Sequence, residues 1–447
     1  IGVASDRIYR IANEFAHRDG ENRPSLAIGG GSAAAHTNGL FNLKAIYSLN
    51  YLVGSVGKPG GVVFNPSPVF DDVPVSPDTA SFRDWMDLTR AMKAGEIEAM
   101  LVRGVDPVYG LPQKLGFREA TYDVPLIVSF ASHIDDTAAI ADLVLPENNY
   151  LEDWGSDIPD PGPGYQMVGF QQPVVRPLFE SPRKHPLHGT RSFPEILMTL
   201  SGAMGVDLKL PGETFKDVLM DSARRLFERG DGSIKAPDLK SFWNGVLQRG
   251  GWWDTSAQYT GPTPVPPELP SVREDPLFDA TPGGGTFYLV PFVSSAITDG
   301  RGAHLPWLQA TPDPISTATW RTWVEINLKL ATDMGIKEGD VIKVTSANGV
   351  IEALAYPNPG VPPEVISVPT GQGHRSGGRY AEGRGDNVFS ILSPTTVNGT
   401  DSLAWASTTV TIQKTGEWNR LPKFENSAPE LSEDKGHKVI QITPQDS

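Results

Sequence analysis

The chain has 447 residues, a formal net charge of −15 and no cysteine. Without cysteine, it provides no disulfide, zinc–thiolate site, iron–sulfur ligand or cysteine nucleophile of its own. The acidic pI of about 5.0 argues against nucleic acid as a partner, because that affinity comes mainly from Lys and Arg. No run of about 18 apolar residues occurs, so no direct membrane span is predicted.

The first 145 residues alternate helical patterns with short apolar strands, which is typical of an α/β fold with a parallel sheet. Hydrophobic periodicity predicts helices at 6–16, 42–53 and 82–94. Strands are expected at 26–28, 99–102, 125–130 and 143–145. Because the chain starts at Ile1 rather than at Met, we expect a processed or partial piece of a longer polypeptide.

The middle of the chain is richer in proline. Residues 155–190 indicate a long surface excursion, and 254–285 indicate a linker. Between them, helices are predicted at 193–204 and 214–228. An aromatic cluster surrounds Gly250-Gly251, and both core packing and a partner surface remain open for it. Its members are Phe242, Trp243, Trp252 and Trp253.

From residue 286 the pattern changes to β, with strands predicted at 286–293, 322–326, 341–346, 350–356 and 365–368. Asn348-Gly349 predicts a hairpin between two of these strands. Asn327 is expected to cap a short helix that ends near Gly335. Residues 421–447 are polar and indicate an extended tail.

The loop 371–385 reads GQGHRSGGRYAEGRG and contains three arginines. Glycine lets a backbone approach a ligand or another backbone closely, and arginine offers planar forks for phosphate or carboxylate. The pattern therefore predicts either an anion site or a structural loop fixed by arginine–carboxylate pairs.

Polar residues also follow two of the predicted strands. Asp106, in Arg103–Pro107, can accept hydrogen bonds from a guanine edge, or it can simply form a turn. His133, Asp135 and Asp136 allow a metal or acid–base site, but helix capping explains the two carboxylates more simply. His185 and His188 are weak metal candidates because no further ligand accompanies them.

Several segments, in order, resemble the molybdopterin oxidoreductase superfamily of the dimethyl sulfoxide reductase type. They are NLKAIYSLNYLVGSVGKPGG at 42–61, FASHIDDTAAIADLVLPENNYLEDWG at 130–155, and 324–346 followed by 371–374. The resemblance implies split, mostly parallel α/β domains followed by a C-terminal double-psi β-barrel. The expected parts are a C-terminal piece of an α/β domain at 1–62, a second α/β domain at 63–280, the barrel at 281–420 and a tail at 421–447.

Segments 161–177, 242–254 and 371–385 resemble one branch more closely, the molybdopterin-like half of the large iron–sulfur subunit of alternative complex III. That complex is a membrane-bound quinol oxidoreductase that passes electrons to a cytochrome c or a copper protein. Its molybdopterin-like half carries no molybdenum cofactor. The resemblance therefore implies no catalytic residue, metal ligand or cofactor in this chain.

The same resemblance implies the surroundings of the chain. The 4Fe–4S and 3Fe–4S clusters and heme c are expected in partner domains and subunits. The expected partners are an iron–sulfur domain, a multiheme cytochrome c and quinol-binding membrane subunits. The expected location is peripheral to the bacterial inner membrane, on its periplasmic face.

The chain departs from working molybdoenzymes. Superfamily members have an iron–sulfur cysteine motif and a Cys, selenocysteine, Ser or Asp ligand to molybdenum, both upstream of the segment that matches 1–61, and neither is present here. If a cofactor were retained, the family pattern would place its guanosine end near Gly104 and Asp106 and its pterin end near Gly373 and His374. With Arg379, these residues are vestigial cofactor-binding candidates.

Three functions remain open. The first is a non-catalytic, cofactor-free scaffold for the electron-transfer chain of a quinol-oxidising complex. The second is a catalytic molybdopterin oxidoreductase of the polysulfide, thiosulfate or tetrathionate reductase type, whose N-terminal part is not in this chain. The third is a free-standing protein that binds a small anion.

Overall fold

The computed structural model describes residues 3–16, 25–73, 79–160, 162–177, 189–261, 265–268, 274–279 and 287–424. The chain divides into two compact units. Unit 1 comprises residues 1–279 and 392–408, and unit 2 comprises residues 280–391 and 409–447. The domain boundaries expected from the sequence stay predictions. Of the expected tail, residues 425–447 lie outside the described residues.

Unit 1 begins with two helices, α1 (Ser5–Phe15) and α2 (Gly39–Leu52), with the 3₁₀ turn η1 (Gly31–Ala34) between them. Both predicted helices are confirmed. The strand predicted at 26–28 is wrong, because no described segment pairs with it. Instead, the side-chain amide of Asn50 binds the backbone N–H and C=O of Ala27.

A three-stranded parallel sheet forms the next part of unit 1, in the order β1 (Ala99–Val102), β2 (Leu126–Ser129) and β3 (Leu143–Val144). The helix before it, α3 (Phe82–Lys93), begins with a capping box between Ser81 and Asp84. The sheet core is made by Met92, Val102, Phe117, Ala120, Val124 and Ile127. All three predicted strands and the predicted helix are confirmed.

Short helices and 3₁₀ turns connect these strands and lead away from them. They are α4 (Pro107–Gly110), η2 (Gln113–Leu115), α5 (Phe117–Ala120), η3 (Thr121–Asp123), η4 (Ala138–Ile140) and η5 (Tyr150–Glu152). Because α4 follows β1 directly and η4 follows β2, the loops at 103–107 and 133–137 both leave the carboxyl ends of parallel strands.

A second, antiparallel sheet in unit 1 corrects the predicted excursion at 155–190. It is formed by β4 (Gly155–Asp157), β5 (Gln166–Gln171) and β6 (Gly251–Asp254). Helices α6 (Phe193–Ala203), α7 (Phe215–Arg229) and α8 (Leu239–Arg249) lie between β5 and β6 in the sequence. Helix α8 and strand β6 have no counterpart in the predictions.

The aromatic cluster around Gly250-Gly251 belongs to the core of this sheet. Trp252 is fully buried, Phe242 and Trp243 are buried, and Trp253 is half-buried. The core alternative is therefore confirmed for three of the four side chains. The remaining buried members of this core are Phe70, Val168, Phe170, Leu219, Ala223, Leu226, Ile234 and Val246.

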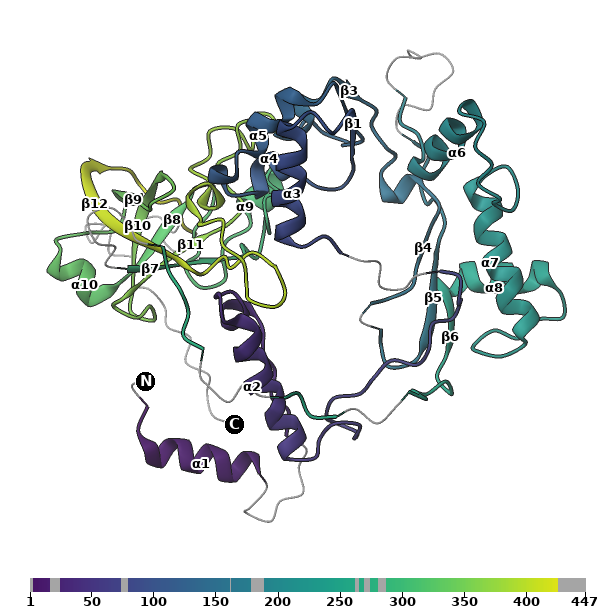
Figure 1. The fold of residues 1–447 in the computed structure, drawn as a ribbon, viewed down its shortest axis with the longest axis horizontal. Coiled ribbons are helices and arrows are strands. Elements are labelled where there is room, and N and C mark those ends of the chain that lie inside the picture. The colour runs from purple at the N-terminus through teal and green to yellow at the C-terminus, as the bar shows by residue number, and fades with distance from the viewer. Residues whose placement is uncertain are drawn as a thin grey trace, which may run out of the picture. The chain divides into compact units, whose positions relative to one another are not determined.

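Unit 2 is a closed six-stranded barrel in the order β10-β8-β11-β7-β12-β9, drawn in green to yellow in Figure 1. Its strands are β7 (Phe287–Phe292), β8 (Trp323–Asn327), β9 (Asp340–Thr345), β10 (Val350–Asn358), β11 (Val365–Pro369) and β12 (Thr408–Trp418). The predicted fold class, α/β followed by a C-terminal β-barrel, is confirmed. Strand β12 was not predicted.

Two predictions for unit 2 are confirmed, the hairpin at Asn348-Gly349 and the helix cap at Asn327. Asn348 and Gly349 join β9 to β10 in an antiparallel hairpin. The side chain of Asn327 accepts a hydrogen bond from the N–H of Leu330 and so caps α10 (Leu328–Asp333). Two further short elements, α9 (Pro306–Ala310) and η6 (Val388–Ile391), lie in the barrel connections.

None of the described helices is long and apolar enough to cross a membrane.

Candidate functional site

Asp106 lies in unit 1, where the chain leaves the carboxyl end of β1. Ligands of open α/β sheets commonly bind at such strand ends. Gly104 turns the chain with a φ of +68°, and a Cβ there would meet no atom within 4 Å. Gly104 is therefore needed for its backbone conformation, and it does not make room for a close contact in this chain.

The carboxylate of Asp106 is used by the protein itself. Its Oδ1 accepts hydrogen bonds from the N–H of Tyr109 (3.4 Å), the N–H of Thr137 (3.0 Å) and the hydroxyl of Thr137 (2.6 Å). Its Oδ2 accepts from the N–H of Asp136 at 3.2 Å. Since a carboxylate offers about four acceptor positions, these bonds favour the turn interpretation over guanine recognition. Asp106 joins the loop after β1 to the loop after β2.

Asp135 has a strongly perturbed acidity. Burial, followed by the negative charges of Asp106 and Asp136, raises the pKa of Asp135 to about 6. Its carboxylate also accepts a hydrogen bond of 2.7 Å from the N–H of Ala138, at the start of η4. The capping interpretation therefore fits Asp135. The backbone N–H of Asp135 donates a hydrogen bond of 3.1 Å to the carbonyl of His133.

We expect Asp135→Asn to stabilise unit 1 at neutral pH by about 1 kcal/mol, after solvent screening is allowed for. The folded chain holds the Asp135 proton more tightly than the unfolded chain, so stability falls as pH rises from about 3.8 to about 6. Asn removes this cost and keeps an oxygen for Ala138. Thermal unfolding should show the gain above pH 6 and little gain near pH 4. Equal gains at both pH values would contradict the assigned cause.

The glycine–arginine loop (371–385) lies in unit 2 and is held by its own backbone. The N–H of Gly373 donates to the carbonyl of Arg384 at 3.1 Å, and the N–H of Gly383 donates to the carbonyl of His374 at 3.4 Å. A Cβ on Gly373 would lie 2.1 Å from the backbone nitrogen of Asn387. The close approach that the glycines predicted is thus an approach of backbone to backbone.

Two of the three arginines of this loop stack on aromatic rings. The guanidinium of Arg379 lies 4.7 Å from the ring centre of Tyr380, and that of Arg384 lies 5.0 Å from the ring centre of Trp320. Arg379 also donates to the Tyr380 hydroxyl at 2.6 Å. Neither arginine pairs with a carboxylate among the described residues. For these two arginines, the predicted fixation by carboxylates is therefore wrong.

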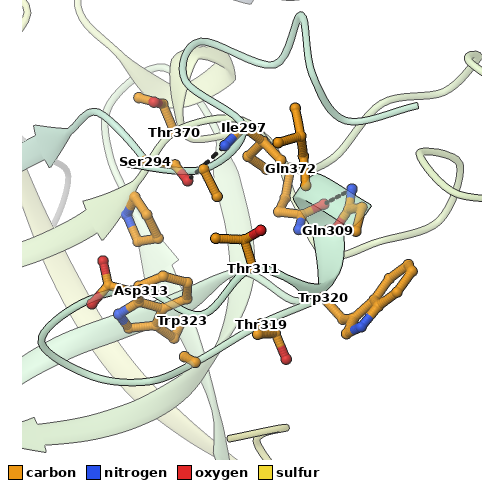
Figure 2. Close-up of a pocket in the computed structure, with 14 residues that line it drawn as sticks. Ser294, Ile297, Gln309, Thr311, Asp313, Thr319, Trp320, Trp323, Thr370 and Gln372 are labelled. Atoms are coloured by element: carbon orange, nitrogen blue, oxygen red, sulfur yellow. Dashed lines mark hydrogen bonds between the residues drawn. The ribbon is translucent and has the colours of Figure 1, made fainter. Parts of the chain in front are cut away.

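His374 is 8% exposed and Gln372 is 5% exposed, so this end of the loop is buried. The amides of Gln372 and Gln309 bind each other reciprocally, at 2.7 and 3.2 Å. They line a cavity of about 20 Å³ beside Trp323 and Thr370, which Figure 2 shows. That volume holds about one water molecule. The cavity is too small for a cofactor.

The candidate residues are distributed over both units. Gly104 and Asp106 belong to unit 1, and Gly373, His374 and Arg379 belong to unit 2. His185 and His188 lie outside the described residues. The sequence predictions missed the partners Thr137, Trp320 and Gln309, because each is more than 25 residues from the side chain that it contacts. No local spacing marks such partners.

Comparisons with known proteins agree with this architecture. The chain is 26% identical, over 86% of its length, to the "Menaquinone reductase, molybdopterin-binding-like subunit" of Nitratidesulfovibrio vulgaris. The "Molybdopterin oxidoreductase" family profile matches residues 6–182, and the "Molydopterin dinucleotide binding domain" profile matches residues 309–402. The chain belongs to the molybdopterin oxidoreductase superfamily of the dimethyl sulfoxide reductase type.

Other superfamily members share less sequence. The "Thiosulfate reductase molybdopterin-containing subunit PhsA" of Salmonella typhimurium is 21% identical over 85% of this chain. The chain covers 56% of PhsA and 52% of the menaquinone reductase protein, so it spans about half the length of these curated relatives. Both relatives are named as subunits of reductases.

The fold is also found in a solved structure. Acetylene hydratase from Pelobacter acetylenicus matches with a TM-score of 0.65 and 15% identity, over 92% of this chain and 63% of the hydratase chain. At 15% identity, this match shows only that the two folds are similar.

The residues of this chain fit a molybdopterin cofactor poorly. The chain has no cysteine to offer a metal. The Asp106 carboxylate accepts hydrogen bonds from Tyr109, Asp136 and Thr137. The backbone around Gly373 contacts residues 386–387 instead of leaving a cradle for a ligand. We therefore assign no reaction step to this chain.

Proposed function

We propose that the chain is a non-catalytic, cofactor-free, molybdopterin oxidoreductase-like subunit or domain of a membrane-bound quinol oxidoreductase. The complex is of the alternative complex III kind, which reduces a cytochrome c or a copper protein. In it, the chain scaffolds the iron–sulfur and heme groups of neighbouring domains and subunits. The N. vulgaris relative supports this proposal, because its name joins a menaquinone reductase with a subunit that is only molybdopterin-binding-like.

The observation that carries the proposal is the use of the candidate cofactor residues within the chain. Asp106 binds the loop after β2, and Gly373 contacts the backbone of residues 386–387. A binding site retained for a large anionic cofactor would instead leave such groups for the ligand. The use of these groups in contacts within the chain is what we expect of a protein that keeps the fold of its superfamily but carries out no reaction.

The expected partners are an iron–sulfur domain, a multiheme cytochrome c and quinol-binding membrane subunits. The expected location is the periplasmic face of the bacterial inner membrane, at its periphery. The exposed guanidinium of Arg379 offers one contact of the kind that a carboxylate-bearing partner takes.

A second function is a catalytic molybdopterin oxidoreductase whose remaining part completes the cofactor site. Two relatives favour it by name, PhsA and a tetrathionate reductase chain of Archaeoglobus fulgidus, which is 22% identical over 83% of this chain. In that case, molybdenum ligands and cluster cysteines would come from outside this chain.

We expect the complex purified through a tag on this chain to contain iron but only traces of molybdenum, tungsten and pterin. Inductively coupled plasma mass spectrometry measures the metals, and fluorescence of the oxidised pterin measures the organic part. A molybdopterin reductase expressed and purified in the same host is the positive control. Stoichiometric molybdenum or tungsten, with two pterins per chain, would establish the second function instead.

A further inference from the structure

Two arginines and two aromatic residues of unit 2 form a continuous row of side-chain contacts. The row runs from Arg384 through Trp320 and Tyr380 to Arg379. The ring centres of Trp320 and Tyr380 lie 6.4 Å apart, and each ring also contacts one guanidinium group. We call these residues the arginine–aromatic row. Because arginine, tryptophan and tyrosine are the residue types most enriched among the side chains that dominate protein–protein binding, the row has the composition of a docking site.

The backbone of Trp320 is strained. Its φ is +63°, which is rare for a bulky residue. Trp320 also lines the small cavity of unit 2 in Figure 2, and its ring contacts the guanidinium of Arg384. Strain of this kind concentrates at functional sites, where the surroundings hold it in place. The Trp320 ring is thus kept in the row at a cost in stability.

Two carboxylates in and beside the glycine–arginine loop bind the backbone instead of the row. Glu382 accepts a hydrogen bond of 3.1 Å from the N–H of Gly378. Asp386, which directly follows the loop, accepts one of 2.6 Å from the N–H of Glu352. Among the described residues, neither carboxylate forms an ion pair with an arginine of the row. The guanidinium groups therefore keep N–H donors for a further acceptor.

Arg379 is the exposed end of the row and is already held in place. It donates a hydrogen bond of 2.6 Å to the hydroxyl of Tyr380 and stacks on the same ring. Its remaining N–H donors form a planar fork that matches a carboxylate. Arg321, next to Trp320 in the chain, is also exposed, and it pairs with no carboxylate of the part that the structure describes. Because Arg379 is ordered before a partner arrives, its side chain loses less entropy on binding.

We infer that the arginine–aromatic row docks an acidic face of a neighbouring protein subunit. Asp or Glu side chains of that face pair with Arg379 and Arg321, and its apolar side chains pack on Tyr380. The inference rests on the proposed function, because it names a surface through which the chain holds a partner.

The exposure of these arginines favours a different subunit over a small anion or a second copy. Sites for small molecules are concave, whereas Arg379 and Arg321 are exposed and neither lines the cavity of Figure 2. A second copy of this chain carries the same net charge of −15, which opposes self-association. A different subunit with a local acidic face avoids both difficulties.

Zero-length cross-linking tests the inference directly. In Arg379→Lys, an amine replaces the guanidinium, and a carbodiimide joins that amine to a carboxylate in contact with it. Mass spectrometry of the complex, purified through a tag on this chain, then identifies the carboxylate. We expect an Asp or Glu of another subunit. Arg301→Lys is the matched control: Arg301 is exposed, belongs to unit 2 and pairs with Asp299 at 2.7 Å, so its link should go to Asp299.

Dissociation of the complex on dilution provides a second measurement. We expect the complex with Arg379→Ala to dissociate at a concentration at least about tenfold higher than the wild type, because a central arginine of an interface is lost. Thermal unfolding of the chain should stay unchanged, since Arg379 is exposed. Arg301→Ala removes the same charge elsewhere in unit 2 and should leave the dissociation unaltered.

A link from position 379 only to Glu382 of the same chain, or to an isotope-labelled second copy, would overturn the inference. Equal dissociation of the complexes with Arg379→Ala and Arg301→Ala would overturn it too. In these cases the intact wild-type complex would still support the proposed function. A tagged wild-type chain that purifies without any other subunit would overturn both proposals.

Discussion

Gly373→Ala is expected to destabilise the glycine–arginine loop by about 3 kcal/mol or more. Gly373 has a φ of +89°, which is strained for any residue with a Cβ. The added Cβ would also lie 2.1 Å from the nitrogen of Asn387 and 2.3 Å from the carbonyl carbon of Asp386. Backbone atoms cannot yield as a flexible side chain does, so the loop must open.

Limited trypsin digestion measures this opening, because the loop contains Arg375, Arg379 and Arg384. Gly378→Ala is the matched control: Gly378 has a similar φ of +74°, but its Cβ would meet no atom within 4 Å. It should cost only about 1–2 kcal/mol from the left-handed backbone. Equal cleavage of the two variants would show that the contact with residues 386–387 is not what fixes the loop.

Trp252→Ala is expected to lower the free energy of unfolding of unit 1 by about 3–5 kcal/mol. Trp252 lies in β6, is fully buried, and donates a hydrogen bond of 3.2 Å from its indole N–H to the carbonyl of Asp231. Its ring leaves no space for a side chain at Gly232, where a Cβ would lie 2.3 Å from the indole. Alanine would therefore leave a large cavity between the sheet and its helices.

Urea unfolding of unit 1 measures this loss. Tyr122→Ala is the control, because Tyr122 is 73% exposed and its removal should change stability by no more than about 0.5 kcal/mol. If the aromatic cluster were mainly a partner surface, Trp252→Ala would instead preserve stability and weaken association with the rest of the complex.

Sequence patterns correctly predicted those helices and strands that depend on residues close together in the chain. Periodicity gave the helices at 82–94 and 214–228, and Asn348-Gly349 gave the hairpin of the barrel. The antiparallel sheet was missed because β4 and β5 lie in the proline-rich stretch 155–190, and β6 begins with Gly251, a residue type that is depleted in strands. β5 pairs with the nearby β4 and also with β6, which follows it only after the three helices α6, α7 and α8.

In the candidate site, too, local features were predicted and contacts between distant residues were not. Glycine content predicted the close approach of the loop 371–385, and the carboxyl end of β1 predicted the place of Asp106. The partners could not be predicted, since Thr137 is 31 residues from Asp106 and Trp320 is 64 residues from Arg384. The segment 26–28 was predicted as a strand from its apolar residues. In the structure it pairs with no described segment, and the side-chain amide of Asn50 binds both backbone groups of Ala27 instead.

The stacking of Arg379 on Tyr380 and of Arg384 on Trp320 has an electrostatic consequence. Aromatic rings hold a guanidinium in place without neutralising it, so Arg379 and Arg384 keep their positive charges in a chain of net charge −15. The protein as a whole repels other acidic molecules until salt screens its net charge, whereas these two guanidinium groups attract a carboxylate at short range. Added salt would thus favour the encounter of the chain with an acidic molecule at long range and weaken its final attachment to the loop.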